Sequence, residues 1–321
     1  MILHLSNMNS SQPLFTIATI TYNSSQWVRQ AIESVLAASF ADFEYLIADD
    51  CSTDNTWNII NEYKDARIIA WQNDANIGEY PNRNKILEKA HGKYILYVDG
   101  DDILYHHTLR NLKEYLDYYT DVVSIWGVAV DKVSFVSLPV CLSPEEITRW
   151  IYLANIWIAQ LGLAETVFQT EALKKSGGFP THLISGDTYT KKRIALEGNT
   201  LLVPMGFMYW RNSPGQASSK MLKSYNGFIN NVQIERGILA ILQQKNFKIP
   251  LEKVKQNIAV RDIKLLFKHT FLKGKFKDGI TLFLKLGFQF RSLKYLFIKG
   301  DYQYKKQLAE SSIQDNFHCR K

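Results

Sequence analysis

The chain has 321 residues, of which 46% are hydrophobic, and a formal net charge of +7, so it can bury the core of one large domain and a smaller unit. No apolar stretch approaches the ~20 residues that cross a bilayer, and the N-terminal residues do not read as a secretory signal. Three distant cysteines without metal-site spacing, Cys51, Cys141 and Cys319, favour a reducing, cytoplasmic location.

Charge divides the chain into two parts. Residues 220–321 contain 21 Lys and Arg against 7 Asp and Glu, which leaves 17 basic and 24 acidic residues before them. Pro214-Gly215 marks the expected boundary, so we predict one domain over residues 1–219 and a basic helical region over residues 220–321. The basic region carries no nucleic-acid recognition motif, and we expect no nucleic-acid partner.

The first hundred residues alternate strand-like and helix-like segments. Strands are predicted at 14–20, 43–48, 67–71 and 93–98, and helices at 26–36, at 57–63 and after the turn at 76–78. This order predicts an α/β fold with a mostly parallel, doubly wound sheet. Ligands of such sheets bind beyond the carboxyl ends of the strands, so we expect Asn23, Asp50 and Asp101 to converge on one crevice.

Three carboxylates, Asp99, Asp101 and Asp102, follow the last of these strands within four positions. Like charges ~4 Å apart repel by about 1 kcal/mol in water and more in a dry cleft, so the cluster favours a bound cation. Hard oxygen ligands select Mg²⁺ or Mn²⁺, which one or two carboxylates hold together with substrate phosphates. The competing interpretation is a solvated acidic turn in which Asp102 caps a helix that starts near Leu104.

Several short motifs occur in a fixed order along the chain. They are Thr21-Tyr22-Asn23, the turn at 49–56, Asn76-Ile77-Gly78 with Arg83-Asn84, Asp99-Gly100-Asp101-Asp102, and a Gly177-Gly178-Phe179 turn followed by Asp187 at a helix start. Together, over roughly residues 13–215, they resemble family 2 of the glycosyltransferases, inverting enzymes with the GT-A fold. The acidic run is similar to that family's Asp-x-Asp motif.

The resemblance implies a role for each motif. Asp187 is implied as the base that takes the proton of the acceptor hydroxyl, and Asp101, with Asp99, as the metal ligand. Asp102 would meet the sugar or cap a helix, and Arg211 would precede a loop that closes over the pyrophosphate. The donor nucleotide would be bound by Thr21, Tyr22, Asn23, Asp50, Arg83 and Asp99, with the Asp50 carboxylate accepting from the base N3–H. Without the resemblance, Asp187 reads as a helix N-terminal acid and Arg83 as a surface arginine.

Two positions depart from the family pattern. Cys51 stands where the family commonly has Gly, so we expect a turn that avoids the left-handed region there. Many relatives place a His two residues after the arginine that Arg211 resembles, but this chain has Ser213 there. The number of protein ligands to the metal is therefore left open.

Leucine and phenylalanine alternate with lysine between Lys264 and Lys306. Helical spacing is predicted at 228–242 and 254–271. Basic amphipathic helices lie on anionic membranes, with about 1 kcal/mol per basic group, and such contact would place the protein beside a lipid-linked acceptor. The alternative is an ordinary helical region that packs on the first domain with its lysines solvated.

These observations combine into one expectation. The chain resembles a bacterial polysaccharide-type glycosyltransferase that uses Mn²⁺ or Mg²⁺ to move a sugar from a nucleotide-diphosphate sugar, with UDP preferred, to a hydroxyl of a glycan or lipid-linked acceptor. It would act in the cytoplasm or at the inner face of the cell membrane. Two alternatives stay open: a nucleotidyltransferase that makes an activated sugar, and a peripheral membrane protein that binds a nucleotide sugar without turnover.

Overall fold

The computed structural model describes residues 12–134, 136–156, 158, 162–211, 225–268, 270 and 276–298. Its strands are β1 (Phe15–Thr21), β2 (Phe43–Asp49), β3 (Ile68–Gln72), β4 (Tyr94–Tyr97), β5 (Ile103–Leu104), β6 (Val122–Val128), β7 (Val140–Leu142), β8 (Thr166–Gln169), β9 (Asn199–Pro204) and β10 (Met208–Tyr209). Its α-helices are α1 (Val28–Leu36), α2 (Thr56–Asn61), α3 (Glu79–Lys89), α4 (Thr108–Tyr118), α5 (Pro144–Tyr152), α6 (Thr170–Lys175), α7 (Gly186–Ile194), α9 (Tyr225–Gln244), α10 (Leu251–Phe267) and α11 (Phe276–Lys285). Short 3-10 helices cover η1 (Val130–Lys132), η2 (Leu163–Glu165) and η4 (Phe290–Leu296).

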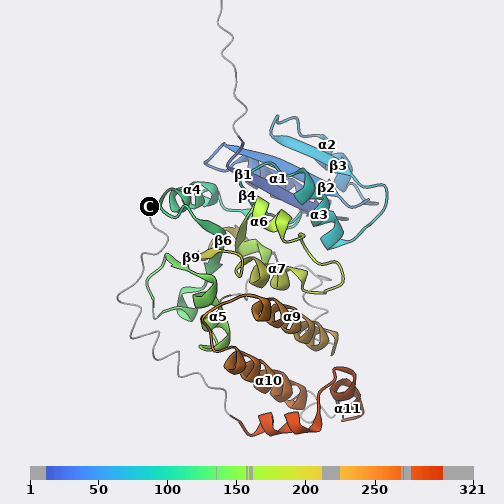
Figure 1. The fold of residues 1–321 in the computed structure, drawn as a ribbon. Helices are drawn as coiled ribbons and strands as arrows, with labels where there is room; N and C mark the ends of the chain where they lie inside the picture. The colour runs from blue at the N-terminus through green and yellow to red at the C-terminus, as the bar shows by residue number, and fades with distance from the viewer. Residues whose placement is uncertain are drawn as a thin grey trace, which may run out of the picture.

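One eight-stranded sheet organises the first part of the chain, in the order β3-β2-β1-β4-β8-β6-β9-β7 (Figure 1). The first four positions are parallel, as the alternation of strands and helices predicts. Strand β8 runs antiparallel to both β4 and β6, and β7 runs antiparallel to β9, so the sheet is mixed. The predicted α/β class with a mostly parallel sheet is confirmed.

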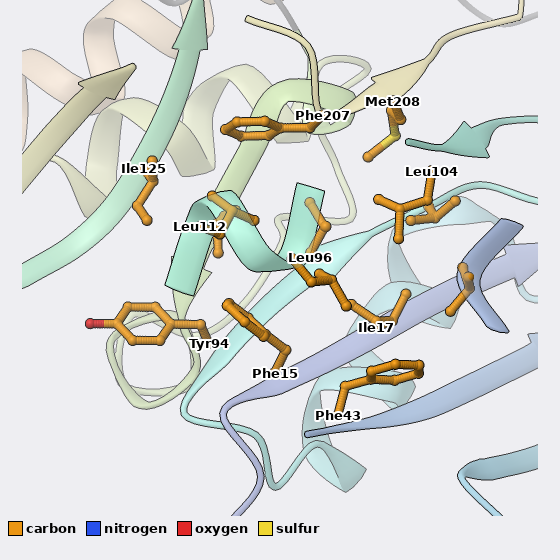
Figure 2. Packing of buried hydrophobic residues seen from close by; sticks show 14 of the residues in the cluster. Phe15, Ile17, Phe43, Tyr94, Leu96, Leu104, Leu112, Ile125, Phe207 and Met208 are labelled. Atoms are coloured by element: carbon orange, nitrogen blue, oxygen red, sulfur yellow. The ribbon is translucent and has the colours of Figure 1, made fainter. Parts of the chain in front are cut away.

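Helices cover both faces of the sheet, and its strands carry apolar side chains on both sides that pack against these helices. Tyr94 and Leu96 of β4 contribute to a core beneath α1 and α4, and Figure 2 shows them beside Phe15 and Leu112. The alternate residues of β4, Ile95 and Tyr97, point to the other face and contribute to a second core on the side of α3 and α6. Burial of each large side chain contributes about 1.5–3 kcal/mol, so these layers fix the strand ends that carry the polar motifs.

The segment after the acidic run differs from the prediction. Residues Ile103–Leu104 form β5, which pairs with β10 through Leu104 and Met208, and the next helix begins only at Thr108. Phe207 and Met208 pack into the same core as Leu104, which explains why this segment extends (Figure 2). Asp102 therefore does not cap a helix.

The C-terminal helices pack on the sheet domain. Ile234 and Ile238 of α9 share a core with Leu183 and Leu196 of the first part of the chain. Figure 1 shows α9 beside α7, followed by α10 and α11. The expected packing is thus present, while the boundary at residue 219 lies outside the described residues and stays a prediction. None of the helices in the described ranges is long and apolar enough to span a bilayer.

A buried ion cluster joins these helices. Glu235 of α9 accepts hydrogen bonds from Tyr152 (2.6 Å), Lys192 (2.6 Å) and Arg261 (3.0 Å), which come from α5, α7 and α10. A buried carboxylate needs such partners because an unpaired one costs several kcal/mol. The cluster therefore fixes how the helical region docks.

Candidate active site

The polar segments after β1, β2 and β4 meet at one edge of the sheet. Thr21 lies opposite Asp49 in the parallel register, and the Asp50 amide donates to the Thr21 carbonyl at 2.8 Å. Gly100 packs so tightly against Thr21 that an added Cβ would lie 2.9 Å from its side chain. The buried Thr21 hydroxyl has no hydrogen-bond partner among the described residues. The ends of β1, β2 and β4 therefore lie together at this edge, while the crevice expected there for Asn23, Asp50 and Asp101 stays a prediction.

Asn23 holds the turn that follows β2. Its backbone amide donates to the Ser52 hydroxyl at 2.8 Å, and its side-chain oxygen accepts from the Thr53 amide at 2.8 Å. Asn23 adopts a φ of 49°, which Asn tolerates better than most residues. The neighbouring Tyr22 ring is 48% exposed at the same edge. Asn23 thus shapes the site, and Tyr22 is available to a ligand.

Cys51 departs from the expected backbone. Its φ is 62°, in the left-handed region that the sequence analysis excluded, because the turn from β2 into the Asp49–Ser52 hydrogen bonds requires it. Cys51 is a free thiol and Cys141 is disulfide-bonded, while Cys319 lies outside the described residues. The expected reducing location predicts free thiols, which holds for Cys51 and not for Cys141.

Asp50 organises the approach to α3. Its carboxylate is buried and accepts hydrogen bonds from the Asn73 side chain (2.9 Å) and from the amides of Ile77 (3.0 Å) and Gly78 (2.9 Å). A carboxylate has about four acceptor positions, so about one remains for a ligand. Asp50 therefore serves first to hold the turn that starts α3.

Arg83 is buried rather than on the surface. Its guanidinium donates to both carboxylate oxygens of Asp99 at 2.8 Å and to Glu79 at 3.1 Å, and it lies 5.1 Å from the Tyr97 ring centroid. Burial lowers the pKa of Arg83, but the charges of Asp99 and Glu79 outweigh this and raise it. The surface-arginine interpretation is wrong because Asp99 supplies a bidentate partner.

Arg211 fastens the acidic turn from a distant part of the chain. Its amide donates to the Asp102 carboxylate at 3.0 Å, and its guanidinium donates to the Asp101 carbonyl at 2.8 Å and lies 3.9 Å from the Trp27 ring centroid. Burial, followed by the charges of Asp99 and Asp101, raises the pKa of Asp102 to about 7. The turn therefore concentrates negative charge where a cation would relieve it.

Asp187 lies in the first turn of α7 and faces Tyr80 of α3. The Tyr80 hydroxyl donates to the Ile184 carbonyl at 3.0 Å and lies 3.5 Å from the Asp187 carboxylate. An added Cβ on Gly186 would lie 3.0 Å from the Tyr80 ring, so this glycine permits the contact. Tyr80 therefore positions Asp187.

Two side chains of α3 connect the acidic groups, because Arg83 donates to Asp99 and Tyr80 adjoins Asp187. Glu79 lies in the same turns, with its side chain 42% exposed. Burial raises the pKa of Glu79, the charge of Arg83 lowers it, and the charges of Asp99 and Asp187 raise it, so the net shift is upward. The first turns of α3 thus join the end of β4 to the start of α7.

Sequence reasoning missed Lys191, one helical turn after Asp187. Lys191 is completely buried, its ammonium lies 4.8 Å from the Trp126 ring centroid, and burial lowers its pKa to about 7 against the opposing charges of Asp187 and Glu165. The i, i+4 spacing from Asp187 was the available signal, but burial of a lysine has no sequence signature. Tyr80 and Glu79 were missed because no motif marks them.

The acidic turn offers carboxylate oxygens as possible metal ligands. Among the described residues, no group of three His, Cys, Asp or Glu side chains is placed to hold a metal ion. Asp101 and Asp99, the predicted ligands, instead offer the one or two carboxylates that Mg²⁺ or Mn²⁺ uses when phosphate oxygens complete its shell. His106 and His107 are exposed at the start of α4 and belong to no such group. The residues present fit a divalent ion shared with a diphosphate.

Comparisons with known proteins agree with this arrangement. Residues 16–146 match the family described as Glycosyl transferase family 2. Over 134 residues the chain is 34% identical to the UDP-Glc:alpha-D-GlcNAc-diphosphoundecaprenol beta-1,3-glucosyltransferase WfaP of Escherichia coli, covering 42% of this chain and 53% of that protein. Over 116 residues it is 32% identical to the poly(ribitol-phosphate) beta-N-acetylglucosaminyltransferase TarS of Staphylococcus aureus, covering 35% of this chain and 20% of that protein. The chain thus spans about half or less of these relatives.

Two solved structures share the fold. The crystal structure of S. aureus TarS 1–349 in complex with UDP-GlcNAc aligns with a TM-score of 0.66 at 21% identity, covering 94% of this chain and 91% of that chain. The mannosyltransferase PcManGT from Pyrobaculum calidifontis, in complex with GDP-Man and Mn²⁺, aligns with a TM-score of 0.57 at 16% identity, covering 95% and 88%. The predicted GT-A-like fold with a helical C-terminal region is confirmed. Residues 16–146 therefore resemble glycosyl transferase family 2 in sequence, and the chain shares the fold of these two solved structures.

Proposed function

We propose that the protein is an inverting glycosyltransferase that moves a sugar from a UDP-sugar to a hydroxyl of a glycan or lipid-linked acceptor in polysaccharide synthesis. One observation carries this proposal. The acidic turn after β4 and Asp187 of α7 both adjoin the first turns of α3, where Arg83 donates to both carboxylate oxygens of Asp99 at 2.8 Å and the Tyr80 hydroxyl lies 3.5 Å from the Asp187 carboxylate. A diphosphate leaving group and an acceptor hydroxyl would then meet in one space.

The donor would bind along the carboxyl ends of β1, β2 and β4. The related TarS structure contains UDP-GlcNAc, and the name of WfaP specifies UDP-Glc, which supports a UDP-sugar here. Tyr22 and the buried Thr21 hydroxyl are the groups best placed to contact the nucleotide, because Asn23 and most of Asp50 are engaged in the scaffold. Arg83 orients Asp99 and contributes to donor binding through it.

Asp101, together with Asp99, would hold Mn²⁺ or Mg²⁺. When bound, the ion supplies charge neutralisation for the departing diphosphate. Asp102 lies beside these ligands, and its carboxylate accepts a hydrogen bond from the Arg211 amide, which fixes the turn.

Asp187 would act as the general base. The acceptor oxygen forms a bond to the anomeric carbon from the face opposite the nucleotide, and the bond from that carbon to the diphosphate oxygen breaks. The acceptor proton passes to the Asp187 carboxylate, and UDP carries away the bonding electrons. Tyr80, 3.5 Å from that carboxylate, keeps Asp187 in place.

The acceptor side suggests contact with a membrane. The name of WfaP specifies a diphosphoundecaprenol acceptor, which is lipid-linked. A peripheral position on the inner face of the cell membrane, through the basic C-terminal helices, would bring the site to such an acceptor. A glycan acceptor needs no membrane contact.

The test combines calorimetry with turnover. We expect UDP to bind the protein with Mn²⁺ and not with EDTA, and Asp101→Ala to abolish this binding. Asp187→Asn should retain UDP binding while the release of UDP from a UDP-sugar in the presence of an acceptor falls by about 10²-fold or more. The control is Glu171→Gln, an acid in the first turn of the neighbouring helix α6 whose side chain is 62% exposed.

Two outcomes would contradict the proposal. Release of pyrophosphate from UTP and a sugar 1-phosphate would favour a nucleotidyltransferase. Binding of UDP-sugar without turnover, over a panel of lipid-linked and glycan acceptors, would favour a non-catalytic binding protein.

A further inference from the structure

An apolar pocket lies in the C-terminal helical region. It is a cavity of about 210 Å³ between α10, α11 and η4 that opens to solvent. This is smaller than the roughly 300–1,000 Å³ of sites for drug-sized ligands, so the pocket has room for a slender group only. Its lining is almost wholly aliphatic and aromatic, and the hydroxyl of Thr270 donates to the Leu266 carbonyl instead of pointing at a ligand. The pocket therefore suits a hydrocarbon group.

Helix α11 is apolar on two faces. Its inward residue Leu282, with Leu286 just beyond its end, packs in a core with Phe228 of α9. An outward stripe, Phe276, Ile280 and Leu284, follows i, i+4 and i+8 spacing, and its side chains are 52%, 62% and 59% exposed. These residues also line the pocket mouth. Ile280 and Leu284 of this second apolar face stay more than half exposed, as on a helix that meets another apolar surface.

The exposed apolar surface extends beyond α11. The surface that we call the apolar rim consists of Phe267, Phe276, Ile280, Leu284, Phe290, Leu293 and Phe297. Phe290 and Phe297 are the most exposed, at 75% and 89%. Soluble monomers rarely expose large contiguous apolar patches without a binding role.

Basic residues accompany the apolar rim. Residues 264–298 contain eight Lys and Arg and a single acidic residue, Asp278, a balance of +7. Lys268, Lys277 and Lys285 are exposed, as are Arg291 and Lys294 of η4. Each basic group near an anionic bilayer raises the affinity by about fivefold. The same charge opposes burial of this face against a second, equally basic copy.

We infer that the apolar rim inserts into the surface of an anionic bilayer and that the pocket takes one hydrocarbon chain of a membrane lipid. This inference rests on the peripheral membrane contact in the proposed function and adds the contact residues and the class of ligand. Insertion covers the apolar side chains, and the surrounding lysines meet the lipid headgroups.

Vesicle flotation tests the surface. The full chain should float with vesicles containing phosphatidylglycerol, less with pure phosphatidylcholine, and less again at high salt. The double substitution Ile280→Glu with Leu284→Glu should weaken binding about tenfold or more. The control is Ile69→Glu, a 51% exposed isoleucine of β3 that should leave flotation unchanged. Calorimetry should show unchanged Mn²⁺-dependent UDP binding in both variants, which separates this inference from the donor site.

A fluorescence measurement tests whether lipid chains reach Phe290, which belongs to the apolar rim and also lines the pocket. Phosphatidylglycerol with brominated chains should quench the fluorescence of Phe290→Trp well beyond that of the unsubstituted chain. Tyr118→Trp, at a 68% exposed position on α4, should show no added quenching. Three results would each overturn the inference, even where UDP binding and turnover persist. The Ile280→Glu, Leu284→Glu protein could float as well as the unsubstituted chain. Brominated lipid could fail to quench a Trp at position 290, or the chain could form a dimer that the double substitution dissociates.

Discussion

Replacing Lys191 by Met should stabilise the protein at neutral pH. Lys191 is completely buried, and burial lowers its pKa from the ordinary 10.5 to about 7 despite the charges of Asp187 and Glu165. Between pH 7 and pH 10.5 the lysine holds a proton in the unfolded chain that it has lost in the folded chain. The free energy of unfolding therefore rises with pH over this range. From pH 7 to pH 9 this gain is about 2 kcal/mol for the native chain, and it should be absent from Lys191→Met.

Urea denaturation at pH 7, 8 and 9 measures this effect as a difference between the two proteins. The difference in the free energy of unfolding between the two proteins excludes the contribution of the other titrating groups, because both proteins share them. These groups include the buried tyrosines whose pKa values burial raises. The advantage of Lys191→Met should be largest at pH 7 and shrink by about 2 kcal/mol at pH 9. A constant difference would refute the reasoning, because it would mean that Lys191 stays charged in the folded protein.

Three further substitutions test the frame of the site. Arg83→Lys keeps the charge but loses the bidentate contact with Asp99, so urea denaturation should show a loss of about 2 kcal/mol and calorimetry a weaker Mn²⁺-UDP affinity. Arg29→Lys, in an exposed ion pair, should leave the stability almost unchanged. Equal losses of stability in Arg83→Lys and Arg29→Lys would contradict the role given to the Asp99 contact. Cys51→Gly should raise stability by about 0.5–1 kcal/mol by relieving the left-handed φ of 62°, and Cys51→Ala should not. Asp50→Asn should cost about 1–3 kcal/mol in urea denaturation, because an amide cannot accept from all three donors, and unchanged stability would contradict the assigned role.

The sequence was most informative where local pattern and topology agree. Strand periodicity placed β1, β2 and β4 within a few residues, and the rule that ligands bind beyond the carboxyl ends of parallel strands brought Asp50 and the acidic turn together. These inferences need only the order of elements. They required no knowledge of which side chains touch.

The errors concern residues whose environment is set by distant parts of the chain. Helix capping was one of two roles left open for Asp102, and it fails because β5 pairs with β10, about a hundred residues later, and extends the segment. A surface position was the alternative to donor binding for Arg83, and it fails because Asp99, 16 positions away, pairs with the guanidinium. For Lys191 the sequence offers only the i, i+4 spacing from Asp187, because the burial of this lysine depends on Trp126 and on the packing of α7 against β6. Each case needs the tertiary fold.

The first turns of α3 supply the physical link between the two halves of the proposed reaction. Asp50 fixes where the helix begins, Arg83 holds Asp99 at the end of β4, and Tyr80 adjoins Asp187 on α7. Arg83 and Tyr80 lie three residues apart on one helix, so a shift of its start would move the metal-side carboxylate and the base together. For this reason Asp50→Asn should lower both UDP affinity and turnover, whereas Tyr80→Phe should lower turnover alone. A Tyr80→Phe protein that loses UDP binding would show that Tyr80 acts on the donor side instead.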